Sequence, residues 1–534
     1  MVDLFVLNFM ESTLNNWLYY MGNEEAKQSE DTKELHDPSS RTKYEHIDDL
    51  NLHPKLDVNI FKSNISGSRI VEKPLKLPVL GNSGASIHDL AHFAGYIKIK
   101  HTVGARMFYY FFESRNKKDD PVIIWLTGGP GCSSAVALFF ENGPFHLNNN
   151  LSLVWNDYGW DKVSNMIYID QPIGTGFSYS SSEKDIRHDE KGVGDDLYDF
   201  LQEFFKVHPD YVKNDLYITG ESYGGHYIPA FAARINQGNK NKDGIHLNLK
   251  GFAIGNGLTE PGIQFKADVD FALLNQLISK KDYNKINQTV PKCEEAAKKC
   301  GNVSVQMPYD LRKQNCDDLS RIDKFLNFPL VKKALGVPKD IHFGACNGKV
   351  YQAMKEDIMR NLEVGLPKLL EEGIKMLVYA GQHDFICNWL GNYRWVKEMK
   401  WSGQADFIAS KVFQFEVEGK KAGLLKNHGP LTFLMVYDAG HMVPKDQPKA
   451  SLQMLKKWIE GKLTKKKFQC STLIDKNCVV AVLVSGRVPF AEGRNCVIQR
   501  GFNGNDCAYH GNPLSASMAV ADGRGTTNYC EQRG

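Results

Sequence analysis

Residues 220 to 225 read Gly-Glu-Ser-Tyr-Gly-Gly, and they constrain the fold of this 534-residue chain more than any other stretch. An apolar run at 216–219 precedes them, and a segment that can form a helix follows from His226. A strand, a sharp turn and a helix around Gly-X-Ser-X-Gly are the setting of the nucleophile elbow in α/β-hydrolases. We therefore predict that Ser222 is a nucleophile. The alternative is an ordinary strand-to-helix turn that happens to contain serine.

The rest of the chain has the pattern of an α/β fold. Apolar residues at helical spacing predict helices at 193–207 and 450–459. Two alternating or aromatic-rich segments, at 95–100 and 106–113, predict an antiparallel hairpin. Short apolar runs bounded by glycine or aspartate are typical of strands buried on both faces of a largely parallel sheet, and they occur at 122–126, 165–169, 216–219, 249–254, 376–379 and 433–437. The alternation predicts an α/β-hydrolase fold, with a mostly parallel central sheet flanked by helices.

Composition divides the chain into three parts. Residues 1–84 are polar, with mixed charges and scattered prolines, and are predicted to be a poorly ordered leader or pro-segment. Residues 85–464 carry the α/β pattern and are predicted to be the catalytic domain, with a lysine-rich helical cap inserted at about 259–340. Residues 465–534 hold five cysteines among many glycines. They predict either a small disulfide-bridged module or a poorly ordered appendage.

Charge and cysteine usage narrow the possible partners and the compartment. A formal net charge of +3 favours neither a nucleic-acid nor a membrane-surface partner, and no run approaches the roughly 20 apolar residues that span a bilayer. The eleven cysteines include no Cys-X-X-Cys pair, which argues against a zinc ribbon. Cysteines and the Asn-X-Ser/Thr sequons at Asn64, Asn150, Asn287 and Asn302 favour the secretory pathway and glycosylation. The first residues are not a convincing signal peptide, because Asp3 stands where a positive charge is expected.

A serine nucleophile needs a base, and the base needs a carboxylate that fixes its tautomer. In α/β-hydrolases the acid and then the histidine follow the serine along the chain. Asp384 and His441 each come shortly after a predicted strand, and the carboxyl ends of parallel strands meet at one edge of the sheet. We therefore predict a triad of Ser222, Asp384 and His441. The rivals are His383, which adjoins the predicted acid, and Asp438, which better fits a turn.

A glycine-rich turn at 128–131 follows the predicted strand at 122–126. The tetrahedral intermediate of acyl transfer needs backbone donors aimed at its oxyanion, and glycines let the backbone come close. We predict that the amides of Gly129 and Tyr223 form this oxyanion hole. A plain turn is the alternative, but two such turns at one sheet edge fit a site better.

Several segments resemble the serine carboxypeptidase family, and they spread over about 90–460. The similarity is greatest to the plant group near the yeast vacuolar carboxypeptidase. The segments are Thr-Gly-Gly-Pro-Gly-Cys-Ser-Ser at 127–134, Glu-Asn-Gly-Pro-Phe at 141–145, Asp-Gln-Pro at 170–172, the elbow at 220–225, Asp-Phe-Ile-Cys-Asn at 384–388 and Gly-His-Met-Val-Pro at 440–444.

The resemblance implies a serine-type exopeptidase that removes one residue at a time from a free C-terminus, works best in acid, and needs neither a metal nor a cofactor. It implies that Glu141, Glu221, the Gly128 amide and the Thr127 side chain bind the terminal carboxylate of peptide and protein substrates. Two carboxyl groups held together cannot both ionise cheaply, so one keeps its proton and can donate to an incoming carboxylate.

The resemblance also assigns residues around the scissile bond. It implies that Cys387 and Met442 line the flanking pockets, and that Cys132 bridges to Cys346. The chain departs from the yeast type at Thr127, where that type has Asn, so carboxylate recognition relies more on the glutamates. The predicted insertion holds three cysteines, at positions 293, 300 and 316, which cannot all pair with one another.

Two other functions remain open on the sequence. An acyltransferase of the same fold passes an acyl group from a sugar ester to an alcohol or amine; such relatives often carry Asp before the serine, and Glu221 favours the peptidase. A non-catalytic binding relative is expected to have lost a triad member, whereas all three residues are present here.

Overall fold

The computed structural model describes residues 69–80 except 76 and 78, then 92–287, 310–312 and 319–463, and two short strands near the C-terminus. The chain divides into two compact units, Met1–Thr464 and Lys465–Gly534. In the second unit the described residues form β15 (Val520–Ala521) and β16 (Thr527–Asn528), which pair antiparallel. The two interpretations of this unit, a disulfide-bridged module or an appendage, both stay predictions.

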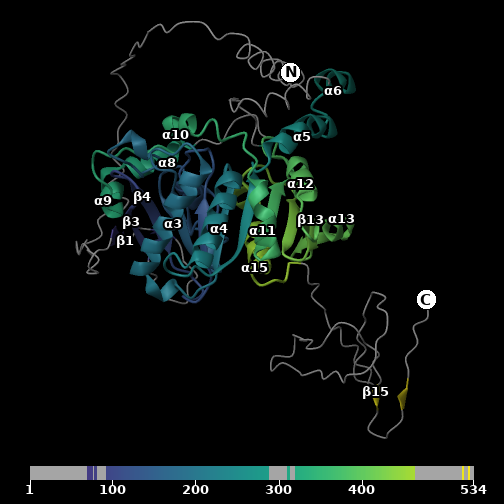
Figure 1. The fold of residues 1–534 in the computed structure, drawn as a ribbon, viewed down its shortest axis with the longest axis horizontal. Helices are drawn as coiled ribbons and strands as arrows, with labels where there is room; N and C mark the ends of the chain where they lie inside the picture. Colours follow the sequence, from purple (N-terminus) through teal and green to yellow (C-terminus); the bar gives the residue numbers. More distant parts are fainter. Residues whose placement is uncertain are drawn as a thin grey trace. The chain divides into compact units, whose positions relative to one another are not determined.

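One eleven-stranded sheet organises the described part of the first unit (Figure 1). The six central strands run parallel, and antiparallel strands extend both ends of the sheet. Parallel strands are covered on both faces, which explains why they read as continuous apolar runs. In spatial order the strands are β1 (Ile70–Pro74), β3 (His92–Lys98), β4 (Arg106–Phe112), β8 (Asn165–Asp170), β5 (Val122–Leu126), β9 (Leu216–Ser222), β10 (Leu249–Gly257), β11 (Lys375–Gly381), β14 (Leu431–Val436), β13 (Lys420–His428) and β12 (Val412–Val417).

Two hydrophobic clusters, one on each face, hold helices against the sheet. Side chains alternate between them along β5, where Ile124 belongs to the first cluster and Trp125 to the second. The first cluster includes residues of α3 (Glu190–Val207), α4 (Gly224–Asn241), α11 (Leu366–Glu371) and α12 (Trp389–Glu398), and the second those of α2 (Ala135–Phe140), α8 (Ser320–Asn327), α9 (Pro329–Leu335) and α15 (Pro448–Ile459). Figure 1 shows α3, α4 and α11 side by side on one face of the sheet. The predicted α/β-hydrolase architecture is confirmed.

The described part of the segment between β10 and β11 contains several helices. These are α5 (Pro261–Leu274), α6 (Lys280–Asn287), α8, α9, α10 (Gly348–Ala353) and α11. The three insertion cysteines, at 293, 300 and 316, lie outside the described residues. The remaining named elements are α13 (Gln404–Ala409), α14 (Val443–Asp446) and a small separate sheet of β2 (Val79–Leu80), β7 (Leu153–Trp155) and β6 (Phe145–Leu147).

The sheet begins before residue 85, where the catalytic domain was predicted to start. Strand β1 pairs antiparallel with β3 from Ile70 onward. Just before it, the Arg69 guanidinium lies 2.6 Å from the Asp199 carboxylate on α3. Charged residues within β1 interrupt the apolar pattern from which a strand is predicted. One of them, Glu72, is buried, and its Oε2 lies 3.0 Å from His208 Nε2. Residues 1–68 of the predicted leader lie outside the described residues.

None of the helices in the described ranges is both long and apolar enough to cross a membrane.

Candidate active site

Ser222 ends strand β9 and has the backbone conformation of a sharp turn. Its φ is +60°, a left-handed value that costs energy for a residue with a Cβ. Among the residues of β9 it alone is not fully buried. The flanking glycines permit close packing: a Cβ on Gly220 would lie 2.1 Å from the Leu126 carbonyl oxygen, and one on Gly225 would lie 2.4 Å from that of Leu258. The predicted strand, turn and helix are present, with a hydroxyl at the tip.

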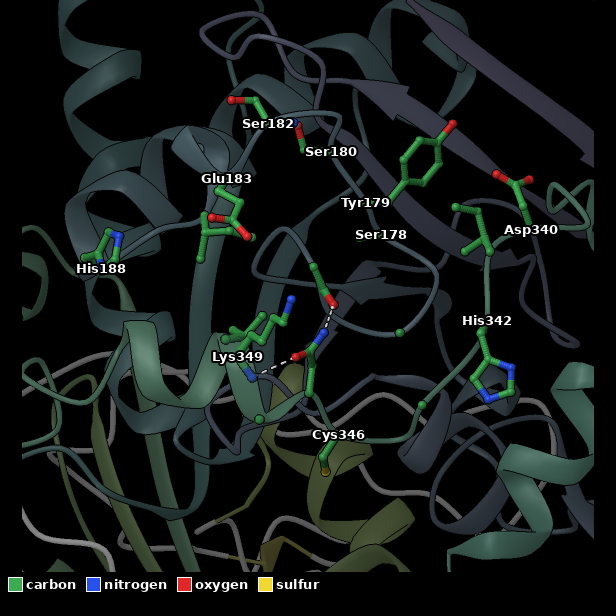
Figure 2. Close-up of a pocket in the computed structure, with 18 residues that line it drawn as sticks. Ser178, Tyr179, Ser180, Ser182, Glu183, His188, Asp340, His342, Cys346 and Lys349 are labelled. Carbon is green, nitrogen blue, oxygen red and sulfur yellow. Dashed lines mark hydrogen bonds between the residues drawn. The ribbon is translucent and has the colours of Figure 1, made fainter. Parts of the chain in front are cut away.

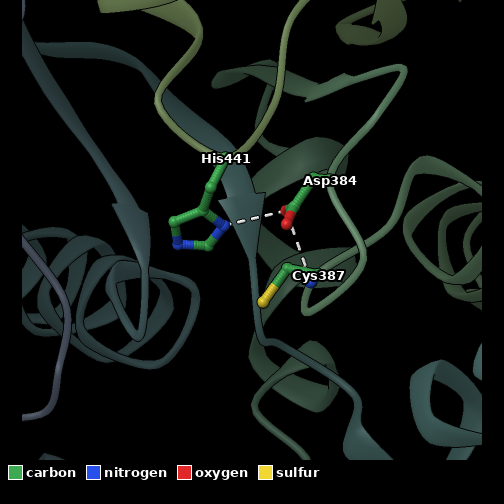
Figure 3. Close-up of side chains that lie close together, drawn as sticks. All are labelled: Asp384, Cys387 and His441. Carbon is green, nitrogen blue, oxygen red and sulfur yellow. Dashed lines mark hydrogen bonds and ion pairs between the residues drawn. The ribbon is translucent and has the colours of Figure 1, made fainter. Parts of the chain in front are cut away.

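His441 and Asp384 form a buried hydrogen-bonded pair (Figure 3). The His441 Nδ1 atom lies 2.8 Å from Asp384 Oδ2. Asp384 follows β11 and His441 follows β14, so they stand at the same sheet edge as Ser222 at the end of β9. Because Nδ1 faces the carboxylate, proton exchange with a nucleophile would go through Nε2.

The two rivals contact each other instead of joining this pair. His383 Nε2 lies 3.9 Å from Asp438 Oδ1, and the Asp438 side chain is 76% exposed. Asp438 also has a positive φ of 52°, as expected for the turn residue that its position suggested.

Asn256, which the sequence reasoning missed, fixes the orientation of Asp384. Its Nδ2 donates to Asp384 Oδ2 at 2.7 Å, and its Oδ1 accepts from the Gly381 amide at 3.2 Å. The Cys387 amide donates to the same Asp384 oxygen at 3.3 Å. Asn256 is fully buried with a φ of +41°. A polar residue at the end of an otherwise apolar strand was the available signal.

The glycine-rich turn touches the elbow. A Cβ on Gly128 would lie 2.2 Å from the Tyr223 amide nitrogen, so only glycine fits there. Gly129 follows with a φ of +111°. The Cys132–Cys346 disulfide, which was implied only by the resemblance, is present and ties this turn to the end of the insertion. The segments that carry the predicted oxyanion donors, Gly129 and Tyr223, are therefore in contact.

A groove of about 790 Å³ has Cys346 of this bridge in its lining (Figure 2). Asn347 also lines it, and its side chain donates to the Gly174 carbonyl at 2.7 Å. Charged or titratable side chains of both signs line it: Glu183, His188, Asp340, His342 and Lys349. None of the residues predicted to form the active site belongs to its lining.

Glu141 and Glu221 are both buried and lie close enough to influence each other's ionisation. Burial raises the pKa of Glu141 to about 7. Burial, and then the charge of Glu141, raise the pKa of Glu221 well above its ordinary range. Within the described part of the chain, no hydrogen bond of ordinary geometry reaches either oxygen of Glu141 or Oε2 of Glu221. The pair thus has unused hydrogen-bonding capacity.

Thr127 is also buried, and its hydroxyl is oriented by a neighbour. Its Oγ1 accepts from the Trp125 indole nitrogen at 3.0 Å, and its amide donates to Ser134 Oγ at 3.2 Å. Since the Thr127 oxygen already accepts, its own proton can be directed at another acceptor.

Cys387 lies beside the acid and base, whereas Met442 follows His441 directly and is partly exposed. Asp384, Cys387 and His441 each place one donor atom within 4.8 Å of the others, the one such group that the described residues form. Burial and the negative charge of Asp384 raise the pKa of the Cys387 thiol well above its usual range. Metals bind the thiolate, so a neutral thiol beside a hydrogen-bonded acid and base suits the wall of a pocket better than a metal site.

Comparison with known proteins gives a consistent result. A family profile described as serine carboxypeptidase matches residues 83–317 and 303–461. The chain is 55% identical over 456 residues to serine carboxypeptidase-like 48 of Arabidopsis thaliana, covering 78% of this chain and 89% of that protein. It is 55% identical over 427 residues to serine carboxypeptidase 3 of Oryza sativa subsp. japonica, covering 75% and 85%.

A solved structure has the same fold. The crystal structure of KEX1(Δ)p, a prohormone-processing carboxypeptidase from Saccharomyces cerevisiae, matches with a TM-score of 0.64. The two sequences are 27% identical, and the match covers 73% of this chain and 94% of the yeast chain.

Proposed function

The chain belongs to the serine carboxypeptidase family, and on that premise we propose that it releases single residues from peptide C-termini through an acyl-enzyme on Ser222. The observation that carries this proposal is the buried 2.8 Å contact between His441 and Asp384 at the sheet edge where the Ser222 turn ends. A base held by a carboxylate at the same sheet edge as a partly buried serine is the arrangement that activates a hydroxyl nucleophile.

In the proposed reaction, His441 takes the proton of Ser222 as Oγ bonds to the carbonyl carbon of the last peptide bond. The amides of Gly129 and Tyr223 stabilise the oxyanion that forms. The carbon–nitrogen bond then breaks, and His441 passes the proton to the departing amine. Water repeats the sequence on the ester and restores the serine, while Asp384 holds the histidine tautomer throughout.

Selection of the terminal bond falls to Glu141, Glu221, the Gly128 amide and Thr127. A carboxyl pair that retains a proton can donate to the ionised carboxylate of a substrate, and the Thr127 hydroxyl is already oriented for donation by Trp125. An internal peptide bond brings no carboxylate to this position, so the arrangement favours removal of one residue at a time. Cys387 and Met442 are proposed to line the pockets on either side of the scissile bond.

The same pair supports activity in acid. Burial raises the pKa of Glu141 to about 7, so below that pH the pair keeps a proton to donate; above it, added negative charge repels the substrate carboxylate. The Cys132–Cys346 disulfide suits an oxidising compartment. We therefore assign the enzyme to an acidic vacuole-like compartment of the secretory pathway or to the extracellular space.

Incubation of the purified protein with a peptide at pH 5 tests the proposal, with release of the terminal residue followed by mass spectrometry. The matched peptide with an amidated C-terminus is the control, and it should be cut much more slowly. A second reaction offers a glucose ester and an acceptor amine. Acyl transfer from the ester without hydrolysis of the peptide would assign the chain to the acyltransferases instead.

A further inference from the structure

A second pair of buried carboxyl groups lies behind the elbow, formed by Glu190 and Asp357. Glu190 is the first residue of α3, and Asp357 lies between α10 and α11. Both side chains are buried. The Tyr223 hydroxyl donates to Asp357 Oδ2 at 3.0 Å. Tyr223 therefore takes part in two features: its amide is a proposed oxyanion donor, and its hydroxyl is hydrogen-bonded to this pair.

The Tyr223 ring packs against two aromatic rings from the first turn of α4, the helix that Tyr223 precedes. It stacks on the ring of His226, with centroids 4.4 Å apart, and meets the ring of Tyr227 edge to face at 5.2 Å. His226 is fixed in turn, because its Nδ1 lies 2.6 Å from the Leu258 carbonyl oxygen. These three rings form one packed group, and the hydrogen bond from Tyr223 connects it to Asp357.

The same group reaches the other side of the oxyanion hole. The Gly131 amide donates to the Tyr227 hydroxyl at 3.3 Å, and the Gly131 carbonyl accepts from the Asn347 amide at 2.9 Å. Gly131 lies two residues after Gly129, the second proposed donor. Both segments that supply oxyanion donors are thus attached to the aromatic group that ends on Asp357.

Within the carboxyl pair, the donors face Asp357. It accepts from Tyr223, and Arg360 Nη1 lies 3.3 Å from its Oδ1. No hydrogen bond of ordinary geometry reaches either Glu190 oxygen within the described residues. Burial, then the charges of Asp357 and Asp189, raise the pKa of Glu190 well above its ordinary range. Burial also raises the pKa of Asp357, but the Tyr223 hydrogen bond and the Arg360 charge oppose that shift, so Glu190 is the partner that more readily keeps a proton.

Building on the proposed function, we propose that Asp357 and Glu190 are positioning residues for the reaction: through the Tyr223 hydroxyl, they hold the Tyr223 amide where it stabilises the oxyanion. A donor acts in proportion to its alignment with the charge that develops, and removing one outright typically costs on the order of a hundredfold or more in kcat. Displacing a donor costs less, so we expect losses of about tenfold.

The test compares Tyr223→Phe, Asp357→Ala, Asp357→Asn and Glu190→Gln. The matched control is Tyr211→Phe, which removes another buried tyrosine–carboxylate bond, from Tyr211 to Glu113 at 2.8 Å. Tyr211 follows the far end of α3, about 27 Å along the helix from Glu190. Each variant is assayed for kcat and KM on one peptide, and for binding of a peptide aldehyde and of the product peptide. In the aldehyde adduct Ser222 Oγ bonds to the carbonyl carbon, its proton moves to His441, and the carbonyl oxygen becomes an oxyanion.

Tyr223→Phe and Asp357→Ala should each lower kcat and aldehyde affinity about tenfold, and their combination should lower them no further. KM and product affinity should stay within about twofold, because the oxyanion exists only in the adduct and the transition state. Asp357→Asn keeps an acceptor for the Tyr223 hydroxyl and should retain most of the parent's activity. Glu190→Gln imitates the protonated acid and should also retain most of that activity. Tyr211→Phe should match the parent protein.

Several results would overturn the inference. One is a Tyr223→Phe variant indistinguishable from Tyr211→Phe; another is an equal loss of aldehyde and product affinity, which would indicate a substrate-pocket role for the ring. No rescue by Asp357→Asn would indicate that Asp357 acts otherwise than as an acceptor. A parent protein that releases no terminal residue would overturn the proposed function itself, and it is told apart from these results because every variant is scored against an active parent.

Discussion

The two buried carboxyl pairs on either side of the elbow follow the same physics but differ in what satisfies them. In both, burial and a like-charged neighbour keep one group protonated. The rear pair is bonded by Tyr223 and faced by Arg360. In each pair three carboxyl oxygens accept no hydrogen bond of ordinary geometry within the described residues: both of Glu141 and Oε2 of Glu221 at the front, and both of Glu190 and Oδ1 of Asp357 at the rear. What separates the pairs is the Tyr223 hydroxyl, which links the rear pair to the elbow; at the front we propose that a substrate carboxylate takes the corresponding place.

The largest expected effect is common to both pairs, because neither matters without the nucleophile. Ser222→Ala should lower kcat on the order of a million-fold while leaving the circular dichroism spectrum and Tm unchanged. The measurement is terminal-residue release at pH 5 with the parent as control. More than a few per cent of residual activity would show that the turn at 222 is structural. The functions proposed for the two carboxyl pairs would then be wrong as well.

The next prediction separates the pairs by substrate. Glu221→Ala should lower kcat/KM about a hundredfold for a peptide acid, because a charged-group contact of about 1.5–3 kcal/mol is lost, and it should change the matched peptide amide little. Asp357→Ala should lower kcat for acid and amide alike, since the oxyanion is the same in both. If the ratio of kcat/KM for the acid to that for the amide were the same in the two variants, the two carboxyl pairs would not have the separate roles proposed for them.

Asn256 offers a third arrangement, in which one carboxylate, Asp384, is bonded by several donors and needs no shared proton. Asn256→Gly tolerates the positive φ but lacks the amide. We expect about a tenfold fall in kcat, with KM unchanged for both acid and amide, because the acid loses one donor but keeps two. Asn392→Ala on α12 is the comparison for lost bonds that do not touch the carboxylate: the Asn392 side chain donates to the Cys387 and Asn388 carbonyls and accepts from the Trp395 indole. A larger effect from that variant would show that packing, rather than orientation of Asp384, governs the rate.

Most of the fold could be predicted because strands buried on both faces of a parallel sheet consist of continuous apolar residues. The predicted strands coincide with β5, β8, β9, β10, β11 and β14 to within a few residues at each end. The predicted serine, acid and histidine were chosen because each lies at or shortly after the carboxyl end of one of these strands. Strand β1 was missed because an edge strand with two charged residues in its five does not form an apolar run.

The remaining site features depend on tertiary placement. Asn256 is one polar residue at a strand end, and its role appears only when β10 lies between β9 and β11. The Tyr223–Asp357 bond joins residues 134 positions apart, and no local pattern marks either end. Burial of Glu190 could not be predicted, because a glutamate in the first turn of a helix usually faces solvent and interacts with the helix dipole.

The central claim is that Glu141 and Glu221 read the substrate's terminal carboxylate by donating a retained proton. The most direct measurement is kcat/KM against pH for one peptide as acid and as amide, in the parent and in Glu221→Gln. The pKa of Glu141 is raised, so the protonated form that donates is present below pH 7 and is lost as the pH rises through about 7. The account predicts a strong preference for the acid at pH 5 that narrows above pH 7, and a Glu221→Gln variant whose preference persists to higher pH because its amide donates without titrating. An acid-to-amide ratio that is the same at every pH in both proteins would contradict it.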